Sequence, residues 1–212
     1  MSMRLWLVVA GYLLGSIPFG LLIARASHGV DVRRVGSGNI GATNVLRTAG
    51  KGAAALTLLL DLLKGWAPVA LARSLGEPDV LVAAVGLAAF LGHVYPIFLG
   101  LRGGKGVATF LGVLFALNVT AAVVVAAVWL LTAAVVRYSS VAAIVASAMS
   151  PVFIWVVDGR LPYIVLAVVL AGFIVVRHRE NLRRLMAGDE SRIGQGMNAA
   201  GADVPRRDTP GF

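Results

Sequence analysis

The sequence has no cysteine, so disulfide bonds and thiol nucleophiles are excluded. Its three histidines, His28, His93 and His178, are far apart in the chain, and none lies near a cluster of carboxylates. That spacing predicts neither a metal site nor a bound cofactor. Charged residues are also scarce, at 14% of the chain, whereas 58% of the residues are hydrophobic. A soluble domain cannot bury so much apolar surface, and we therefore expect an all-α integral membrane protein.

Acidic residues are few, because ten aspartates and glutamates stand against 19 lysines and arginines, for a net charge of +9. Such an excess can indicate a nucleic-acid-binding protein. In a chain this apolar, with a mean hydropathy of +0.86, a membrane interpretation is better. The basic residues then set the topology and attract anionic lipid headgroups or anionic substrates, and no nucleic acid is expected as a partner.

Six apolar runs suggest membrane-crossing helices, each of which takes about 20 residues. The runs cover residues 5–24, 53–75, 80–99, 107–136, 141–157 and 161–176. The first run is longer than the core of a signal peptide and lacks a convincing cleavage site after it. We therefore interpret it as the first spanning helix.

The run 107–136 is too long for one crossing, because its residues would extend about 45 Å as a helix against a hydrocarbon core of about 30 Å. It is either one steeply tilted helix or two short helices that turn near Asn118. Two helices place 15 of the 19 lysines and arginines on one side, as the positive-inside rule requires of the cytoplasmic side. We therefore predict a bundle of seven transmembrane helices with the N-terminus outside and the C-terminus in the cytoplasm. Residues 1–193 would form a single domain, and residues 194–212 a disordered cytoplasmic tail.

The first polar motif is GSGNIGATNVLR, residues 36–47, which follows the first span. Glycine lets a ligand approach the main chain, and successive N–H groups can form an anion-binding nest. Ser37, Asn39, Thr43 and Asn44 add neutral donors, and the forked guanidinium of Arg47 suits a phosphate. The spacing fits neither a Walker loop nor a dinucleotide fingerprint. A flexible linker is the alternative, but so many donors in an apolar chain favour anion binding.

The segment GGKG, residues 103–106, is the second anion-binding candidate. Gly103 and Gly104 precede Lys105, and a helix is predicted to begin at about Val107. A helix N-terminus has unpaired N–H groups and a partial positive charge, which with a lysine suits a phosphate. A simple membrane anchor is the alternative for Lys105, but an anchor would not need the glycines.

Asp61, Lys64 and His93 lie inside predicted spans, where a charge is costly and usually marks a function or a pair. Asp61 and Lys64 are three residues apart and share one helix face. They form either a structural ion pair or a substrate contact. An isolated His93 is more often a hydrogen-bonded core residue than a catalyst, and we keep it as a candidate site residue.

The segment RHREN, residues 177–181, follows the last span. An arginine-rich stretch there usually anchors the chain to anionic lipid. That role does not account for His178 and Asn181, which share one helix face and are predicted to line a cytoplasmic pocket.

These motifs resemble the bacterial acyl-phosphate:glycerol-3-phosphate acyltransferases of the PlsY type. The resemblance runs from about residue 11 to residue 193. It rests on GSIPFG (15–20), DVRRVGSGNIGATNVLRTAG (31–50), GKGAAALTLLLDLLKG (50–65), GHVYPIFLGLRGGKGVAT (92–109) and RHREN. It implies transfer of a fatty acyl group from acyl phosphate to the 1-hydroxyl of glycerol-3-phosphate. The products would be lysophosphatidate and inorganic phosphate, in the first step of phospholipid synthesis. The implied setting is the bacterial inner membrane, with the active site facing the cytoplasm and a monomer as the expected state.

The resemblance also implies residue roles. The acyl phosphate would contact Ser37, Gly38, Asn39, Arg47, Lys105, Ser140, His178 and Asn181. Asp61 and Lys64 would serve glycerol-3-phosphate, and His178, Asp61 and Lys105 are the catalytic candidates. The general base is either His178, Asp61 or the phosphate of the donor itself. Either Ser139 or Ser140 corresponds to the serine of the family's site, and the Tyr-x-Ser pattern favours Ser140.

A membrane transporter of phosphate esters is the chief alternative. Transporters usually bind their substrate near the bilayer midplane and often contain internal repeats. This sequence shows no repeat between its halves, and its polar motifs gather at one predicted membrane face.

Overall fold

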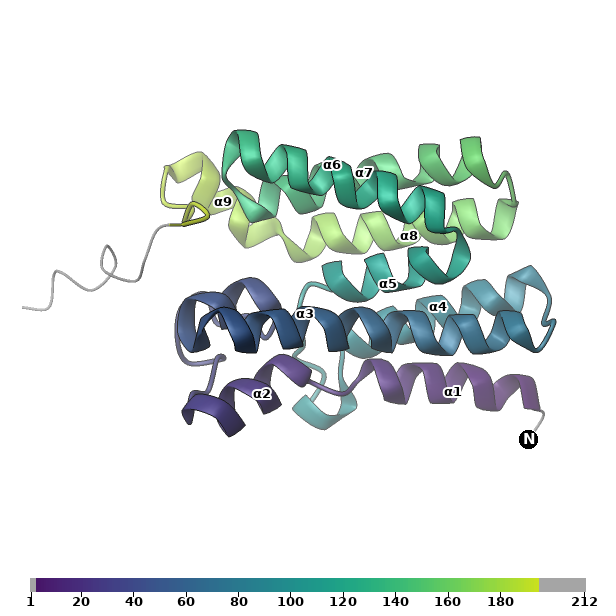
Figure 1. Cartoon of the computed structure of the whole chain (residues 1–212), viewed down its shortest axis with the longest axis horizontal. Coiled ribbons are helices and arrows are strands. Elements are labelled where there is room, and N and C mark those ends of the chain that lie inside the picture. Colours follow the sequence, from purple (N-terminus) through teal and green to yellow (C-terminus); the bar gives the residue numbers. More distant parts are fainter. Residues whose placement is uncertain (1–2, 195–212) are drawn as a thin grey trace, which may run out of the picture.

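The computed structural model describes residues 3–194, and that part of the chain is an all-α bundle without strands, as predicted. Its helices lie side by side along the long axis of the molecule (Figure 1). In chain order they are α1 (Met3–Gly15), α2 (Phe19–His28), α3 (Ala42–Ser74), α4 (Asp79–Val94), the 3-10 turn η1 (Ile97–Leu99), α5 (Val107–Leu117), α6 (Val119–Val136), α7 (Ser139–Val157), α8 (Leu161–Arg177) and α9 (Arg179–Ala187). The tail predicted to be disordered lies outside the described residues, apart from Gly194.

Within residues 3–194, five segments are long and apolar enough to cross a membrane. They are Arg4–His28, Ala42–Ser74, Asp79–Leu99, Val119–Val136 and Ser139–Val157. A sixth is obtained when α8 and α9, which meet at 48°, are taken as one broken span. The remaining predicted span is α5, which has 11 residues and is only about 16 Å long. The count of seven spans therefore stays a prediction.

The chain turns at Asn118, which is the second of the two alternatives for the run 107–136. Asn118 is extended, with φ −155° and ψ 113°, and its side chain accepts a 3.0 Å hydrogen bond from the N–H of Ala121 at the start of α6. α6 then runs back beside α5 (Figure 1). Arg73 donates to the carbonyl oxygens of Ala116 and Leu117, and so satisfies the last turn of α5.

Four glycines bring two helix pairs into backbone contact. Gly15 and Gly92 face each other between α1 and α4, and Gly65 and Gly112 do so between α3 and α5. At each of them a Cβ atom would lie only 2.0–2.3 Å from a carbonyl oxygen of the opposite helix. Small residues at such positions let membrane helices approach closely.

The core consists of two clusters. The larger one lies between α3, α4, α5 and α8 and includes Phe90, Phe110, Leu114 and Tyr163. The smaller one joins α2, the loop that follows it and the start of α3, through residues such as Leu21, Val32, Ile40 and Val45. The smaller cluster therefore holds the glycine-rich loop of residues 36–41 against the bundle.

α3 is interrupted at Gly50, which has φ 81° and ψ 177°. This conformation is accessible essentially to glycine alone. The break separates the first two turns of α3, which carry Thr43 and Arg47, from the apolar remainder. The end of α3 that bears the polar motif therefore takes its own direction.

We predict that Gly50→Ala destabilises the protein by about 1–3 kcal/mol, because alanine cannot adopt this backbone conformation without strain. Gly52→Ala is a matched control, since a Cβ at either position meets no atom within 4 Å and Gly52 has ordinary φ. Alanine at position 52 should stabilise the helix by about 0.5–1 kcal/mol. Thermal unfolding of both variants in detergent micelles tests this, and equal unfolding temperatures would contradict it.

Candidate functional site

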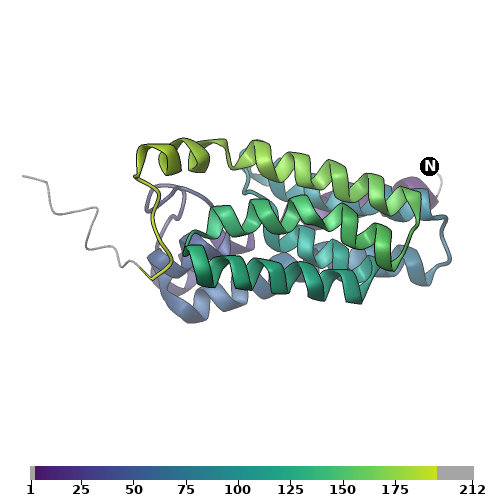
Figure 2. The same cartoon turned by 90° about the horizontal axis from the view of Figure 1, so that it is seen from above.

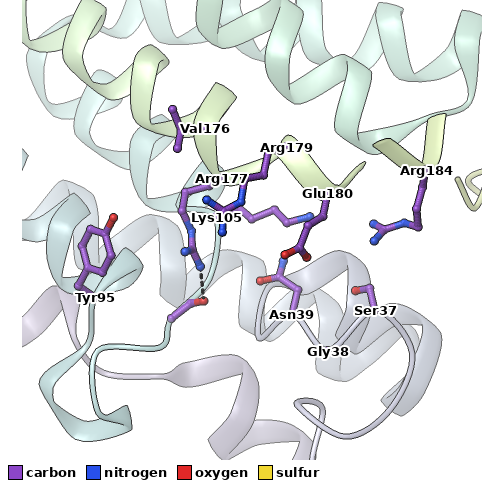
Figure 3. A pocket seen from close by; sticks show the side chains of 11 residues that line it. Ser37, Gly38, Asn39, Tyr95, Lys105, Val176, Arg177, Arg179, Glu180 and Arg184 are labelled. Atoms are coloured by element: carbon purple, nitrogen blue, oxygen red, sulfur yellow. Dashed lines mark hydrogen bonds between the residues drawn. The ribbon is translucent and has the colours of Figure 1, made fainter. Parts of the chain in front are cut away.

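A cavity of about 560 Å³ lies between α3, α5, α6 and α7 and gathers most of the predicted site residues. Those on its wall are Ser37, Asn39, Thr43, Asn44, Arg47, Asp61, His93, Lys105, Ser140, His178 and Asn181. A hollow of about 200 Å³ adjoins it and shares Ser37, Asn39 and Lys105 with it. The hollow also has Gly38, Gly103 and Arg177 on its wall, and Figure 3 shows Asn39 and Ser37 on one side of it with Arg177 and Lys105 on the other. The structure thus brings three sequence motifs together.

The amide of Asn44 shapes the glycine-rich loop from within. Its Nδ2 donates to the carbonyl oxygens of Val32, Val35 and Asn39 at 2.9–3.2 Å, and its Oδ1 accepts from the N–H of Ser37 at 2.9 Å. Asn44 is 1% exposed. Although it was predicted to bind substrate, its hydrogen-bonding groups are used to fold the loop, and it presents Ser37 and Asn39 to the cavity.

The first turns of α3 meet the start of α7 across the cavity. Thr43 Oγ1 lies 3.3 Å from Ser139 Oγ, and the two hydroxyls share a hydrogen bond. Ser140, the other candidate serine, lies on the same wall but bonds to a different group, described below. Arg47 donates to the carbonyl oxygen of Ser191 at 3.4 Å, which leaves its guanidinium without a carboxylate partner among the described residues.

The segment around Lys105 keeps the predicted helix start, but the two glycines before the lysine do not supply free N–H groups. α5 begins at Val107 as expected, but the N–H groups of Gly103 and Gly104 donate to the carbonyl oxygens of Val94 and His93, both at 3.1 Å. They are therefore not available to an anion. These glycines are needed for packing instead, since a Cβ on Gly103 would lie 2.1 Å from the carbonyl oxygen of His93, and one on Gly104 would lie 2.2 Å from its Nε2.

Arg177 fixes the same segment from α8. Its Nη2 donates to the carbonyl oxygen of Gly103 at 3.1 Å, which is the dashed contact in Figure 3. Its Nε donates to the carbonyl oxygen of Gly104 at 3.3 Å. Because carbonyl oxygens carry no net charge, Arg177 holds the loop in place and keeps its positive charge beside Lys105.

Lys105 reaches across to the start of α9, where its ammonium donates to Oδ1 of Asn181. Burial lowers the pKa of Lys105 to about 8, although nearby Glu190 acts in the opposite direction. His178 is buried one turn before Asn181, and its Nδ1 lies 2.8 Å from the carbonyl oxygen of Ile174. Since a carbonyl can only accept, Nδ1 is the donor there, and Nε2 of a neutral His178 is left as a proton acceptor.

Asp61 and Lys64 form a buried ion pair, with Lys64 Nζ 2.6 Å from Asp61 Oδ1 and side chains at most 2% exposed. Lys64 also donates to the carbonyl oxygen of Ile17 at 2.8 Å and lines neither the larger cavity nor the hollow. His93 Nδ1 is 3.7 Å from the same carboxylate oxygen, too far for a hydrogen bond. This geometry favours a structural role for Lys64, whereas Asp61 and His93 remain on the cavity wall.

Glu190 belongs to this cluster but was not among the predicted residues. It accepts hydrogen bonds from Ser140, Asn181 and Arg184. Ser140 and Asn181 thus share one acceptor, Oε1 of Glu190, whereas Ser139 contacts Thr43. The sequence contains one weak signal for Glu190. The chain has only ten acidic residues, and this one follows the arginine-rich stretch of residues 177–184.

The arrangement is suited to an anion with an apolar substituent. Lys105, Arg47 and Arg177 supply positive charge, and Ser37, Asn39 and Thr43 supply neutral polar groups. No group of three or more His, Cys, Asp or Glu side chains that could hold a metal occurs in residues 3–194. A large part of the cavity wall is apolar and includes Leu58, Leu111, Val125, Trp129 and Leu130.

Comparison with known proteins agrees with this geometry. The family model described as glycerol-3-phosphate acyltransferase matches residues 5–188. Proteins named glycerol-3-phosphate acyltransferase from Methylorubrum populi and Rubrobacter xylanophilus are 53% and 52% identical to this chain; each match covers 89% of this chain and 92% and 94%, respectively, of the relative.

Two crystal structures of PlsY, an integral membrane glycerol 3-phosphate acyltransferase, have the same fold. One is the glycerol 3-phosphate form, with a TM-score of 0.87 and 45% identity, and the other is the lysphosphatidic acid form, with a TM-score of 0.85 and 44% identity. Each match covers 91% of this chain and 96% of the other. This chain therefore belongs to the glycerol-3-phosphate acyltransferase family of integral membrane proteins, of the PlsY type.

Proposed function

We propose that the protein transfers a fatty acyl group from acyl phosphate to the 1-hydroxyl of glycerol-3-phosphate, with lysophosphatidate and inorganic phosphate as products. The observation that carries this proposal is the single cavity of about 560 Å³ that joins cationic and polar groups to a long apolar wall. The relatives crystallised in glycerol 3-phosphate and lysphosphatidic acid forms support the acceptor and the product. The acyl phosphate donor is our inference from the sequence motifs and the site.

The apolar wall accounts for the acyl chain of the donor. Leu58 of α3, Leu111 of α5, and Val125, Trp129 and Leu130 of α6 line it. An acyl chain placed there is shielded from water, and each buried methylene group stabilises binding by about 0.8 kcal/mol. The phosphate end then lies among Lys105, Arg47 and the glycine-rich loop.

The reaction requires no nucleophile from the protein, because an acyl phosphate is already activated. The 1-hydroxyl oxygen of glycerol-3-phosphate attacks the acyl carbonyl carbon, and the bond from that carbon to the phosphate oxygen breaks. Lys105 and Arg47 stabilise the negative charge that moves to the carbonyl oxygen and the leaving phosphate. The protein contributes mainly by holding both substrates in the geometry of attack.

Two groups are suited to accept the proton of the attacking 1-hydroxyl. One is Nε2 of His178, whose other ring nitrogen is bound to the carbonyl oxygen of Ile174. The other is the phosphate of the donor. Asp61 is less suitable, because its carboxylate is paired with Lys64 at 2.6 Å.

The membrane setting is proposed from charge and helix direction. We infer seven passages in the bacterial inner membrane, with the short α5 and the returning α6 counted separately, the N-terminus outside and the site at the cytoplasmic face. The positive-inside rule supports this orientation, since the basic loops gather at the end of the bundle that holds the polar site. A monomer is sufficient, because one chain supplies all the residues invoked.

The donor can be tested directly with purified protein in detergent. Palmitoyl phosphate and glycerol-3-phosphate should give lysophosphatidate and phosphate in equal amounts, whereas palmitoyl-CoA should give neither. Lysophosphatidate formed only from palmitoyl-CoA would overturn the donor assignment. No product from either donor, with folded protein, would favour the transporter alternative, which uptake of glycerol-3-phosphate into proteoliposomes would then test.

Arg47→Lys should lower kcat/KM for palmitoyl phosphate by about 10- to 100-fold, because lysine cannot reproduce the two parallel hydrogen bonds of a guanidinium to phosphate. Arg34→Lys is the matched control. Arg34 is exposed, lies in the same loop region and lines neither the larger cavity nor the hollow. Steady-state phosphate release from both variants provides the comparison, and normal kcat/KM in Arg47→Lys would remove Arg47 from the phosphate site.

A further inference from the structure

The residues that follow α9 turn back over the site. We call residues 189–194 the return segment, which crosses from α9 toward the connection between α6 and α7 (Figure 2). Ile193 and Arg137 exchange two hydrogen bonds, from the Ile193 N–H to the Arg137 carbonyl at 2.6 Å and from Arg137 Nη2 to the Ile193 carbonyl at 3.1 Å. Arg47 donates to the carbonyl of Ser191 from the opposite wall. The return segment is therefore attached to two walls of the cavity.

Glu190 is the residue of the return segment that enters the polar cluster, and its side chain is 7% exposed. Its Oε1 accepts hydrogen bonds from Ser140 Oγ and Asn181 Nδ2, both at 2.7 Å. Its Oε2 accepts from Arg184 Nε at 2.9 Å. Burial alone would raise the pKa of Glu190, but these three hydrogen bonds outweigh it and hold the pKa below its usual value. The carboxylate is thus ionised at neutral pH.

This carboxylate and the Lys105 ammonium together fix the orientation of the Asn181 amide. Because Nδ2 donates to Glu190, Oδ1 must face the other way, and there it accepts from the ammonium of Lys105. With the carboxylate removed, the Asn181 NH₂ group would lose its acceptor, and only the Lys105 ammonium would hold the amide in place. The hydroxyl of Ser140 would lose its fixed acceptor at the same time.

We propose that Glu190 is a positioning residue for acyl transfer, which orients Ser140 and Asn181 and thereby holds Lys105 in the geometry that receives the phosphate. The inference rests on the proposed function and adds a residue beyond the family match, which ends at residue 188. Arg184 balances the charge of Glu190, so the carboxylate can stand beside an anionic substrate.

The same contact affects the protonation of Lys105. The charged or titratable groups that face Lys105 are Glu190, Arg184, Glu180, Arg177 and His178. Burial lowers the pKa of Lys105 to about 8, and Glu190 opposes that shift more than any other group. Removal of the Glu190 charge should lower this pKa further, so that Lys105 loses its proton at a lower pH.

Glu190→Gln tests the proposal, with kcat/KM for palmitoyl phosphate measured from pH 6 to about 9. We expect a loss of about 10- to 100-fold at neutral pH, as for other hydrogen bonds to charged groups. We also expect the alkaline limb of the profile to move to lower pH. A purely structural role would not move that limb.

Asp189→Asn is the matched control, because it removes the same charge one residue away at an exposed position. It should leave both kcat/KM and the pH profile unchanged. Normal values in Glu190→Gln, or an equal shift of the alkaline limb in Asp189→Asn, would overturn the proposal.

Glu190→Asp keeps the negative charge on a side chain that is one methylene group shorter. This variant tests the proposal if Glu190→Gln does not fold in detergent. It should keep the alkaline limb in place while kcat is reduced, and an unreduced kcat would overturn the proposal. Activity of the unaltered protein separates the two claims. If that protein does not use acyl phosphate, the proposed function fails, whereas an active protein unaffected by Glu190→Gln refutes the role of Glu190 alone.

Discussion

Direct contact between helix backbones is the constraint on which the site depends. Gly65 and Gly112 let α3 and α5 touch, and Gly15 and Gly92 do the same for α1 and α4. α5 begins two residues after Lys105, so its contact with α3 also sets where that lysine stands. In a bilayer, where apolar side chains gain little by leaving lipid for protein, such close approach is a main source of helix association.

The shortage of acidic residues has a second structural effect, because two arginines at the site are held by carbonyl oxygens instead of carboxylates. Arg177 donates to Gly103 and Gly104, and Arg47 donates to Ser191. A carbonyl oxygen orients a cation without cancelling its charge. The polar end of the bundle therefore keeps an excess of positive charge for anionic substrates, although Glu190 pairs with Arg184 and Asp61 with Lys64.

Several features of the fold and site could be predicted from the sequence because they depend on local composition. Apolar length predicted the helical bundle, and the charge distribution predicted the turn at Asn118. The polar motifs identified Ser37, Lys105 and Asn181, which the structure brings to adjoining hollows.

Other features depend on contacts between distant segments, which a sequence pattern does not show. Asn44 was predicted to contact the substrate, yet its NH₂ group donates to three carbonyl oxygens of the loop that precedes it. The N–H groups of Gly103 and Gly104 are paired with the end of α4. Glu190 lies nine residues after Asn181 and becomes part of the site only because the chain turns back.

The break in α3 has a consequence for the handedness of the chain. With φ 81° and ψ 177°, Gly50 adopts the mirror image of an ordinary extended residue. A residue of D configuration would fit there without strain, whereas an L-amino acid would not. The polar start of α3 and its membrane-embedded remainder are thus joined at a point where the backbone is locally of the opposite hand, and in a ribosomally made chain glycine is the residue that can supply such a joint.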